Sequence, residues 1–128
     1  MFSHVMVGSN DIDRSKKFYD ALIGATGGKP GVVDAKGRLI YAHDGGLLMV
    51  SKPIDGKPAA GANGGTIGFK VASTEQGDAW HKAGVANGGK AVEDPPGIRQ
   101  GGNGPIYLAY LRDPDGNKLC ALHRMPKA

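Results

Sequence analysis

The feature that most limits the fold of this 128-residue chain is an internal repeat of pattern. A shift of 62 residues aligns the apolar stretch at 4–7 with that at 66–69, and Phe18-Tyr19 with Trp80-His81. A shift of 71 residues aligns Asp44-Gly45-Gly46 with the stretch that begins at Asp115. Few aligned residues are identical, so the repeat is one of pattern. It predicts two similar supersecondary units, and the length suits one domain with one core.

The first half, about residues 1–52, is expected to hold one strand, one helix and two further strands. Asn10 or Asp11 can cap the helix, because a short side-chain oxygen accepts a free backbone N–H. Buried-type residues recur behind the cap at helical spacing, and a glycine-rich stretch prevents the helix from continuing. The expected elements are a strand at 2–8, a helix at 11–23, and strands at 37–42 and 46–51 joined by a turn at 44–46.

The second half, about residues 64–128, repeats this order after a linker at 52–61 rich in Pro and Gly. Ser73 or Thr74 can cap its helix. The expected elements are a strand at 65–71, a helix at 74–86, a short strand near 90–93, a Pro-Pro-Gly loop, and strands at 105–112 and 117–124. The sequence therefore predicts a single α+β domain over 1–128, built from two βαβββ modules.

Composition excludes several functional classes. The net charge is +4, but Lys and Arg are interleaved with acids and form no basic run, so we expect no nucleic-acid partner. No apolar stretch approaches the ~20 residues of a membrane helix, and the start of the chain is not of signal-peptide type, so a cytoplasmic protein is expected. The one cysteine, Cys120, allows neither an internal disulfide nor a cysteine-based zinc cluster.

The turn sequence Asp113-Pro114-Asp115-Gly116-Asn117, the stretch from Asp11 to Phe18-Tyr19 and a histidine on the first strand together resemble the glyoxalase/bleomycin-resistance/dioxygenase (vicinal oxygen chelate) family. The resemblance spans essentially the whole chain. It implies that the two modules pair into a curved mixed sheet around an open-barrel cavity. It also implies a homodimer, formed by side-by-side packing or by module exchange through the linker.

Enzymes of this family bind a divalent metal through four cavity positions, which the resemblance places at His4, Met49, Thr66 and Cys120. Only His4 is an ordinary ligand for a hard or borderline cation. Met49 and Thr66 supply a weak thioether acceptor and a neutral hydroxyl. We therefore expect no metal and no other cofactor; the alternative is a loosely held divalent ion on His4 and Cys120.

Two residues are candidates for catalysis. His4 can act as an acid or base in a closed pocket, or it is a hydrogen-bonded strand histidine. Cys120 is a reactive thiol or a buried inert one. If the Asp113–Gly116 turn is symmetric, Cys120 opposes Ala109 and shares a face with Tyr107.

The ligand-binding candidates are Met49, Thr66, Tyr107 and Arg99. Arg99 begins a glycine-rich stretch to Asn103 that is either a mobile flap over the cavity or an ordinary flexible loop. In the first case Arg99 contacts an anionic substrate.

Two functional hypotheses follow. One is a glyoxalase-like small-molecule protein, a lyase or isomerase similar to lactoylglutathione lyase, with a degenerate metal site. The alternative is a non-catalytic protein that binds and sequesters a small molecule, as bleomycin-resistance proteins do. The poor set of metal ligands favours the second.

Overall fold

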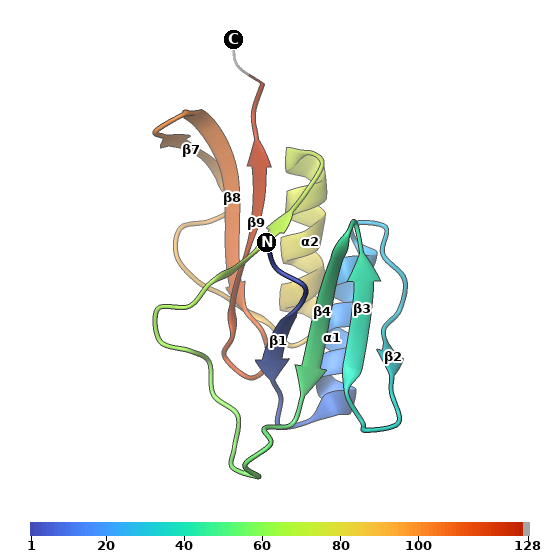
Figure 1. The fold of residues 1–128 in the computed structure, drawn as a ribbon. Coiled ribbons are helices and arrows are strands. Elements are labelled where there is room, and N and C mark those ends of the chain that lie inside the picture. Colours follow the sequence, from blue (N-terminus) through green and yellow to red (C-terminus); the bar gives the residue numbers. More distant parts are fainter. Residues whose placement is uncertain (127–128) are drawn as a thin grey trace.

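The computed structural model describes residues 1–126, which form two helices and nine strands in two modules (Figure 1). The first module contains β1 (Val5–Gly8), α1 (Ile12–Gly24), β2 (Val32–Val33), β3 (Leu39–His43) and β4 (Gly46–Ser51). The second contains β5 (Ile67–Lys70), α2 (Thr74–Ala86), β6 (Lys90–Ala91), β7 (Gly97–Gly101), β8 (Gly104–Arg112) and β9 (Lys118–Arg124).

Each module folds its strands into its own mixed sheet. The first sheet has the order β1-β4-β3-β2, and the second has the order β5-β9-β8-β6 with β7 also paired to β8. In both sheets the first strand of the module pairs in parallel with the last, and the other pairings are antiparallel. The predicted α+β fold of two modules is confirmed. The unpredicted short strand β2 completes the βαβββ order of the first module, and β7 is one strand more than that order in the second. Neither sheet closes, and β1 and β5 are edge strands.

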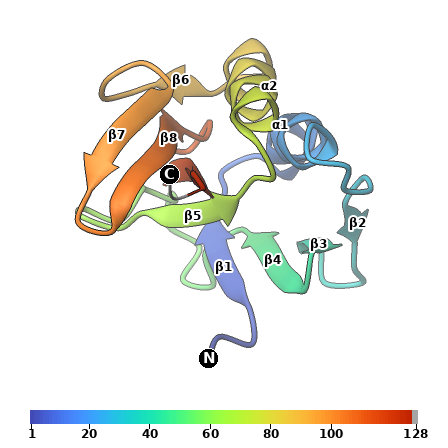
Figure 2. The same cartoon turned by 90° about the horizontal axis from the view of Figure 1, so that it is seen from above.

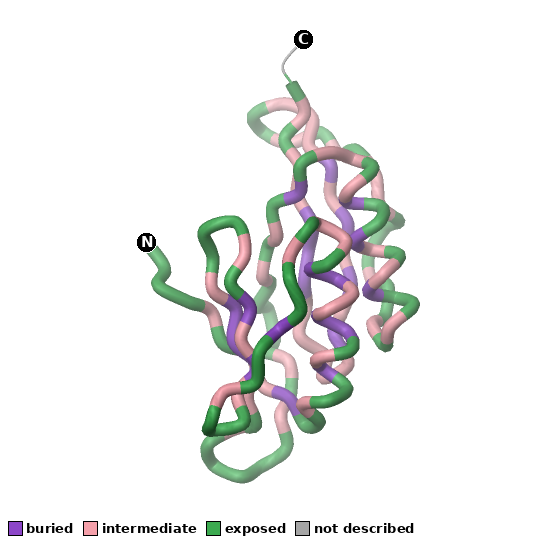
Figure 3. The backbone as a smooth tube through the Cα atoms, turned by 90° about the vertical axis from the view of Figure 1, so that its right-hand side faces the viewer, coloured by how far each residue is buried: buried purple, intermediate pink, exposed green. Residues whose placement is uncertain are grey.

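The two helices lie side by side in the angle between the sheets (Figure 2). The buried face of α1 is formed by Ser15, Phe18, Tyr19, Leu22 and Ile23. Its four apolar side chains form one shared hydrophobic cluster with Trp80 of α2 and the helix-facing residues of both sheets. Most of the buried residues lie where the helices and the sheets meet, and much of the remaining chain is exposed (Figure 3). The opposite face of each sheet points away from the helices.

The helix caps and the first hairpin follow the local sequence. The Asp11 carboxylate accepts from the Arg14 amide at 3.0 Å, and the Ser73 hydroxyl accepts from the Gln76 amide at 3.0 Å. Asp44 and Gly45, with φ of 49° and 80°, connect β3 and β4. Two successive positive φ values are typical of the tight turns that match the twist of a hairpin.

One predicted loop is a strand. Residues 97–101, expected to lie in the Pro-Pro-Gly loop and the flap, form β7 and pair with β8 from Gly97–Leu108 to Gly101–Gly104. Gly104 adopts a φ of 107°, which is a conformation that glycine reaches without strain and that lets the chain reverse. The high glycine content concealed this strand, because glycine has no side chain to pack on a sheet and is therefore rare in strands.

The pairing of β8 with β9 differs by one residue from the prediction. Asp113 pairs with Asn117 rather than with Gly116: the Asp113 amide donates to the Asn117 carbonyl oxygen at 2.9 Å. Cys120 therefore opposes Tyr110, and Ala109 opposes Ala121. Because a shift of one residue exchanges the two faces of a strand, Tyr107 lies on the face opposite to Cys120.

Candidate functional site

The four family metal positions divide between the two outward sheet faces. On the first sheet, Val5 packs on the core, so the neighbouring His4 and Met6 point outward, and Met49 lies beside Met6. On the second sheet, Ile67 packs on the core, so Thr66 points outward. The two sheets meet at an angle with the helices inside it (Figure 2), so their outward faces point in different directions within one chain.

His4 and Cys120 have contrasting surroundings. His4 is exposed, and its Nδ1 lies 2.8 Å from the Ser3 hydroxyl. Cys120 is buried on its sheet next to Gly68, where an added Cβ would lie 3.5 Å from the sulfur. Burial raises the pKa of the Cys120 thiol, although Lys118 opposes the shift. The thiolate, which is the form that binds metals and attacks electrophiles, is thereby disfavoured.

The residues at these four positions do not fit the divalent metal that the fold family implies. They supply no carboxylate, one imidazole and one thiol whose ionisation burial opposes. Within residues 1–126 there is also no group of three His, Cys, Asp or Glu side chains arranged to hold a metal ion.

Tyr107 and Arg99 lie apart from these positions and have partners of their own. The Tyr107 hydroxyl lies beneath α2 and donates to Asp78 at 2.7 Å. Burial and this hydrogen bond raise the Tyr107 pKa. The Arg99 guanidinium donates to backbone carbonyl oxygens around β7, namely those of Asp94, Pro95, Gly97 and Leu108. It holds the hairpin together.

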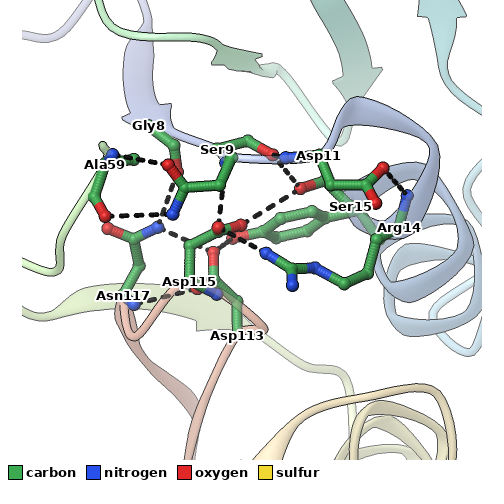
Figure 4. Close-up of polar contacts among 11 residues, drawn as sticks. Gly8, Ser9, Asp11, Arg14, Ser15, Ala59, Asp113, Asp115 and Asn117 are labelled. Carbon is green, nitrogen blue, oxygen red and sulfur yellow. Dashed lines mark hydrogen bonds and ion pairs between the residues drawn. The ribbon is translucent and has the colours of Figure 1, made fainter. Parts of the chain in front are cut away.

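The Asp113–Asn117 turn has a structural task that its sequence did not reveal (Figure 4). The Asp115 carboxylate accepts from the Asn10 amide at 2.9 Å and from the Arg14 guanidinium at 2.7 Å. The Asn117 side-chain amide donates to the Gly8 carbonyl at 3.2 Å. The second module is thereby joined to the β1–α1 connection of the first. We call this contact the closed junction.

Asp113 is the buried centre of the same turn. Its carboxylate accepts from the Tyr19 hydroxyl at 2.6 Å, from the Asn117 side chain at 2.8 Å, and from the Asp115 and Asn117 amides at 2.9 Å each. The Tyr19 contact comes from α1 of the other module. Burial and the neighbouring Asp113 raise the pKa of Tyr19 well above its ordinary value, so its hydroxyl remains a donor.

The place that corresponds to the closed junction in the other half of the repeat contains a cavity of about 390 Å³. The turn between β3 and β4, at 43–46, is the counterpart of 113–117, and β5 with α2 is the counterpart of β1 with α1. Here these parts line a cavity instead of a polar contact, together with the segment Met1–Val5. We call this place the open junction. His4 is the predicted site residue that reaches it.

Three residues of the open junction were not predicted as site residues. The sequence pattern places His43 next to the predicted turn, Trp80 on a helix and Lys70 on a strand, and all three line the cavity. The signal that could have found them is the repeat itself, because superimposing the halves places the 43–46 turn against β5 and α2.

No helix within residues 1–126 combines the length and the hydropathy needed to span a membrane. No match was found among curated proteins.

Similar structures share the fold over nearly the whole chain. A glyoxalase/bleomycin resistance protein from Albidiferax ferrireducens T118 is 58% identical, with a TM-score of 0.93, and the match covers 97% of this chain and 99% of that one. A glyoxalase/bleomycin resistance protein/dioxygenase family enzyme from Burkholderia phytofirmans PsJN is 16% identical over 94% and 95% of the two chains, with a TM-score of 0.72. Lactoylglutathione lyase from Agrobacterium tumefaciens is 21% identical over 95% and 92%, with a TM-score of 0.63. At such low identities the last two support the fold alone.

The family model described as Glyoxalase/Bleomycin resistance protein/Dioxygenase superfamily matches residues 1–121. This match covers the first module, the second module as far as residue 121, the closed junction and all four family metal positions. The chain belongs to the glyoxalase/bleomycin resistance protein/dioxygenase superfamily.

Proposed function

We propose that this protein is a homodimer that binds a small organic molecule without a metal ion. The observation that supports the proposal is the character of the four family positions, which carry a single imidazole, a thiol with a raised pKa, a thioether and a hydroxyl. Such a set can contact an organic ligand by hydrogen bonds and apolar contacts, whereas metal-assisted chemistry needs several anionic or imidazole ligands.

A second copy is needed because the outward faces of one chain do not face one another. In a two-fold dimer, the first sheet of one protomer can face the second sheet of its partner, which brings His4 and Met49 opposite Thr66 and Cys120. Exposed apolar side chains on the first outward face support such pairing: Met6 is 47% exposed and Val32 is 67% exposed.

The test begins with light scattering of the purified protein and elemental analysis after gentle purification. We expect the mass of a dimer and no stoichiometric Zn, Ni, Mn or Fe. A metabolite panel is then screened by thermal unfolding, because a ligand that prefers the folded state raises the midpoint.

His4→Ala and Thr66→Ala should reduce the rise in the unfolding midpoint that such a ligand causes. His123→Ala should not, because His123 pairs with Tyr107 and shares its helix-facing side of the second sheet. A monomer, or one stoichiometric transition metal, would overturn the proposal.

A metal-independent lyase or isomerase is the second candidate, and the Ser3–His4 contact favours it. A hydroxyl at 2.8 Å from Nδ1 can orient the imidazole and leave Nε2 free to exchange a proton with a bound substrate. With any ligand found above, His4→Ala should abolish turnover if the protein is an enzyme. If the protein only sequesters the compound, that variant should weaken binding with no turnover to lose.

A further inference from the structure

The outward faces of the two sheets differ in charge. The strands of the first sheet contain no Lys, Arg, Asp or Glu, whereas those of the second contain six Lys or Arg and no Asp or Glu. All six cations lie on one side, because residues alternate along a strand and ladder partners share a side. The six are Lys70, Lys90, Arg99, Arg112, Lys118 and Arg124.

The side that carries these cations is the outward one. Phe69, Leu111 and Leu119 pack in or against the hydrophobic cluster beneath the helices, and each is the direct neighbour of a cation in its strand. Because neighbours in a strand point to opposite sides, the cations point away from the core. The sequence hides this arrangement, since the cations are separated along the chain by apolar residues and form no run.

The chain balances little of this positive charge. Within residues 1–126, Lys118 forms an ion pair with Glu93, and the other five cations form none. Glu93 follows β6 and has a φ of 59°, in the left-handed region, which is strained for a residue with a side chain. Strain of this kind collects at functional sites. The excess positive charge on this face favours an anionic ligand.

Room for such a ligand lies in the middle of the cationic face. Gly68 and Cys120 are ladder partners there, and a Cβ at Gly68 would meet only the Cys120 sulfur within 4 Å, at 3.5 Å. Lys70 lies two residues from Gly68 along β5. Lys118 lies two residues from Cys120 along β9, in the opposite direction, with its ammonium 5.0 Å from the centroid of the Tyr110 ring. Since two residues of a strand span about 6.6 Å, both ammonium groups can reach an anion over Gly68.

We propose that this face binds a small organic anion, with its charge over Gly68 between Lys70 and Lys118. The inference rests on the proposed function and deepens it, because the apolar part of the ligand lies against the first sheet of the partner, at Met6 and Met49. Packed sheets lie about 10 Å apart, so a face that a partner's sheet opposes admits a small molecule rather than a nucleic acid.

The test titrates hexanoate and its neutral analogue hexanamide into the full chain at constant ionic strength. Two-dimensional N–H NMR follows the backbone amides of Gly68 and Cys120. We expect saturable shifts with hexanoate and at least about fivefold weaker binding of hexanamide. Equal affinity for the two compounds, or no saturable shift with hexanoate up to about 20 mM, would contradict the proposal.

Lysine variants locate the recognition of charge. Lys70→Gln and Lys118→Gln should each weaken hexanoate binding about threefold or more and leave hexanamide binding unchanged. Lys82→Gln, on the exposed surface of α2, is the matched control and should change neither. Lys70 has no ion pair to lose within residues 1–126. Unchanged hexanoate affinity in the Lys70 variant would therefore refute the proposal even if loss of Lys118 disturbs the fold.

Glu93 supplies a test of the opposite sign. Its carboxylate is paired with Lys118 in the free protein, so it competes with a bound anion. Glu93→Gln should strengthen hexanoate binding about twofold or more, whereas Glu75→Gln, at the exposed start of α2, should leave it unchanged. Unchanged or weaker binding in the Glu93 variant would speak against an anion at Lys118 and refute the proposal.

Failure of this inference and failure of the proposed function give different results. A metal-free dimer that binds hexanoate and hexanamide equally would refute the recognition of an anion and leave the proposed function in place. A monomer in light scattering would remove the partner's sheet and refute both.

Discussion

The two junctions between the modules occupy equivalent places in the repeat and are built in opposite ways. At the closed junction, Asp113, Asp115 and Asn117 form a network of short hydrogen bonds with β1 and α1 (Figure 4). At the open junction, the shorter turn Asp44-Gly45 leaves a cavity. The difference teaches that a duplicated fold can fill one copy of a contact with hydrogen bonds and leave the other as a cavity.

The largest expected difference between the junctions is in the free energy of unfolding, when the same substitution, Asp to Asn, is made in the turn of each junction. Asp113→Asn replaces an oxygen that accepts hydrogen bonds with an amide that donates, among four donors that point at it. We expect a loss of about 2–4 kcal/mol in the free energy of unfolding, measured with urea. Asp44→Asn should change it by less than about 0.5 kcal/mol, because Asn tolerates a positive φ. Similar losses in the two variants would mean that both junctions stabilise the fold.

Glycines test the same comparison by steric means. A Cβ at Gly61 would overlap the Gly116 carbonyl oxygen, so Gly61→Ala must displace the linker from the closed junction. We expect a loss of about 1–3 kcal/mol in urea unfolding. A Cβ at Gly46 meets only the His43 carbonyl oxygen, at 3.6 Å, so Gly46→Ala should be neutral within about 0.5 kcal/mol. Retained stability in the Gly61 variant would show that the linker does not need this close approach.

A smaller effect is expected from the ion pair across the closed junction. Arg14 and Asp115 lie 2.7 Å apart, with side-chain exposures of 44% and 1%. A double-mutant cycle with Arg14→Gln and Asp115→Asn should give a coupling energy of about 1 kcal/mol. The Lys16–Asp20 pair within α1, with exposures of 35% and 27%, should give about 0.3 kcal/mol. Equal coupling energies would assign the effect to helix surface charge rather than to the junction.

The smallest effect concerns acid stability beneath the open junction. Burial by itself would raise the pKa of Asp20, but the Gly31 amide, Lys16 and Tyr41 together lower it below the ordinary value of 3.8. A carboxyl whose pKa is lower in the folded state stabilises the protein above its unfolded pKa and loses this effect as the pH falls through the folded value.

Urea midpoints measured from about pH 6 to about pH 3 should therefore fall less steeply for Asp20→Asn than for the unaltered protein. Because the Tyr41 hydroxyl, beside the cavity, donates to Asp20 at 2.6 Å, the same variant should loosen the floor of the open junction. Parallel pH profiles would show that Asp20 contributes nothing to acid stability.

The fold could be predicted further than the site. The spacing of Phe18, Tyr19 and Leu22 predicted the buried face of α1, and Asp44-Gly45 predicted the first hairpin. The one-residue error in β8–β9 pairing arose because Asp113 accepts from the amides of both Asp115 and Asn117, which lengthens the turn. That error alone moved Tyr107 to the other face of the sheet.

The sequence by itself determined the α+β class, the two modules and the residue types at the four family positions, because periodicity and turn chemistry act over a few neighbouring residues. Only the tertiary structure decided that the helices lie inside the angle between the sheets, that Arg99 holds a hairpin, and that one junction is closed while the other contains a cavity. These depend on contacts such as Tyr19–Asp113, between residues 94 positions apart, and a local pattern cannot specify contacts over such distances.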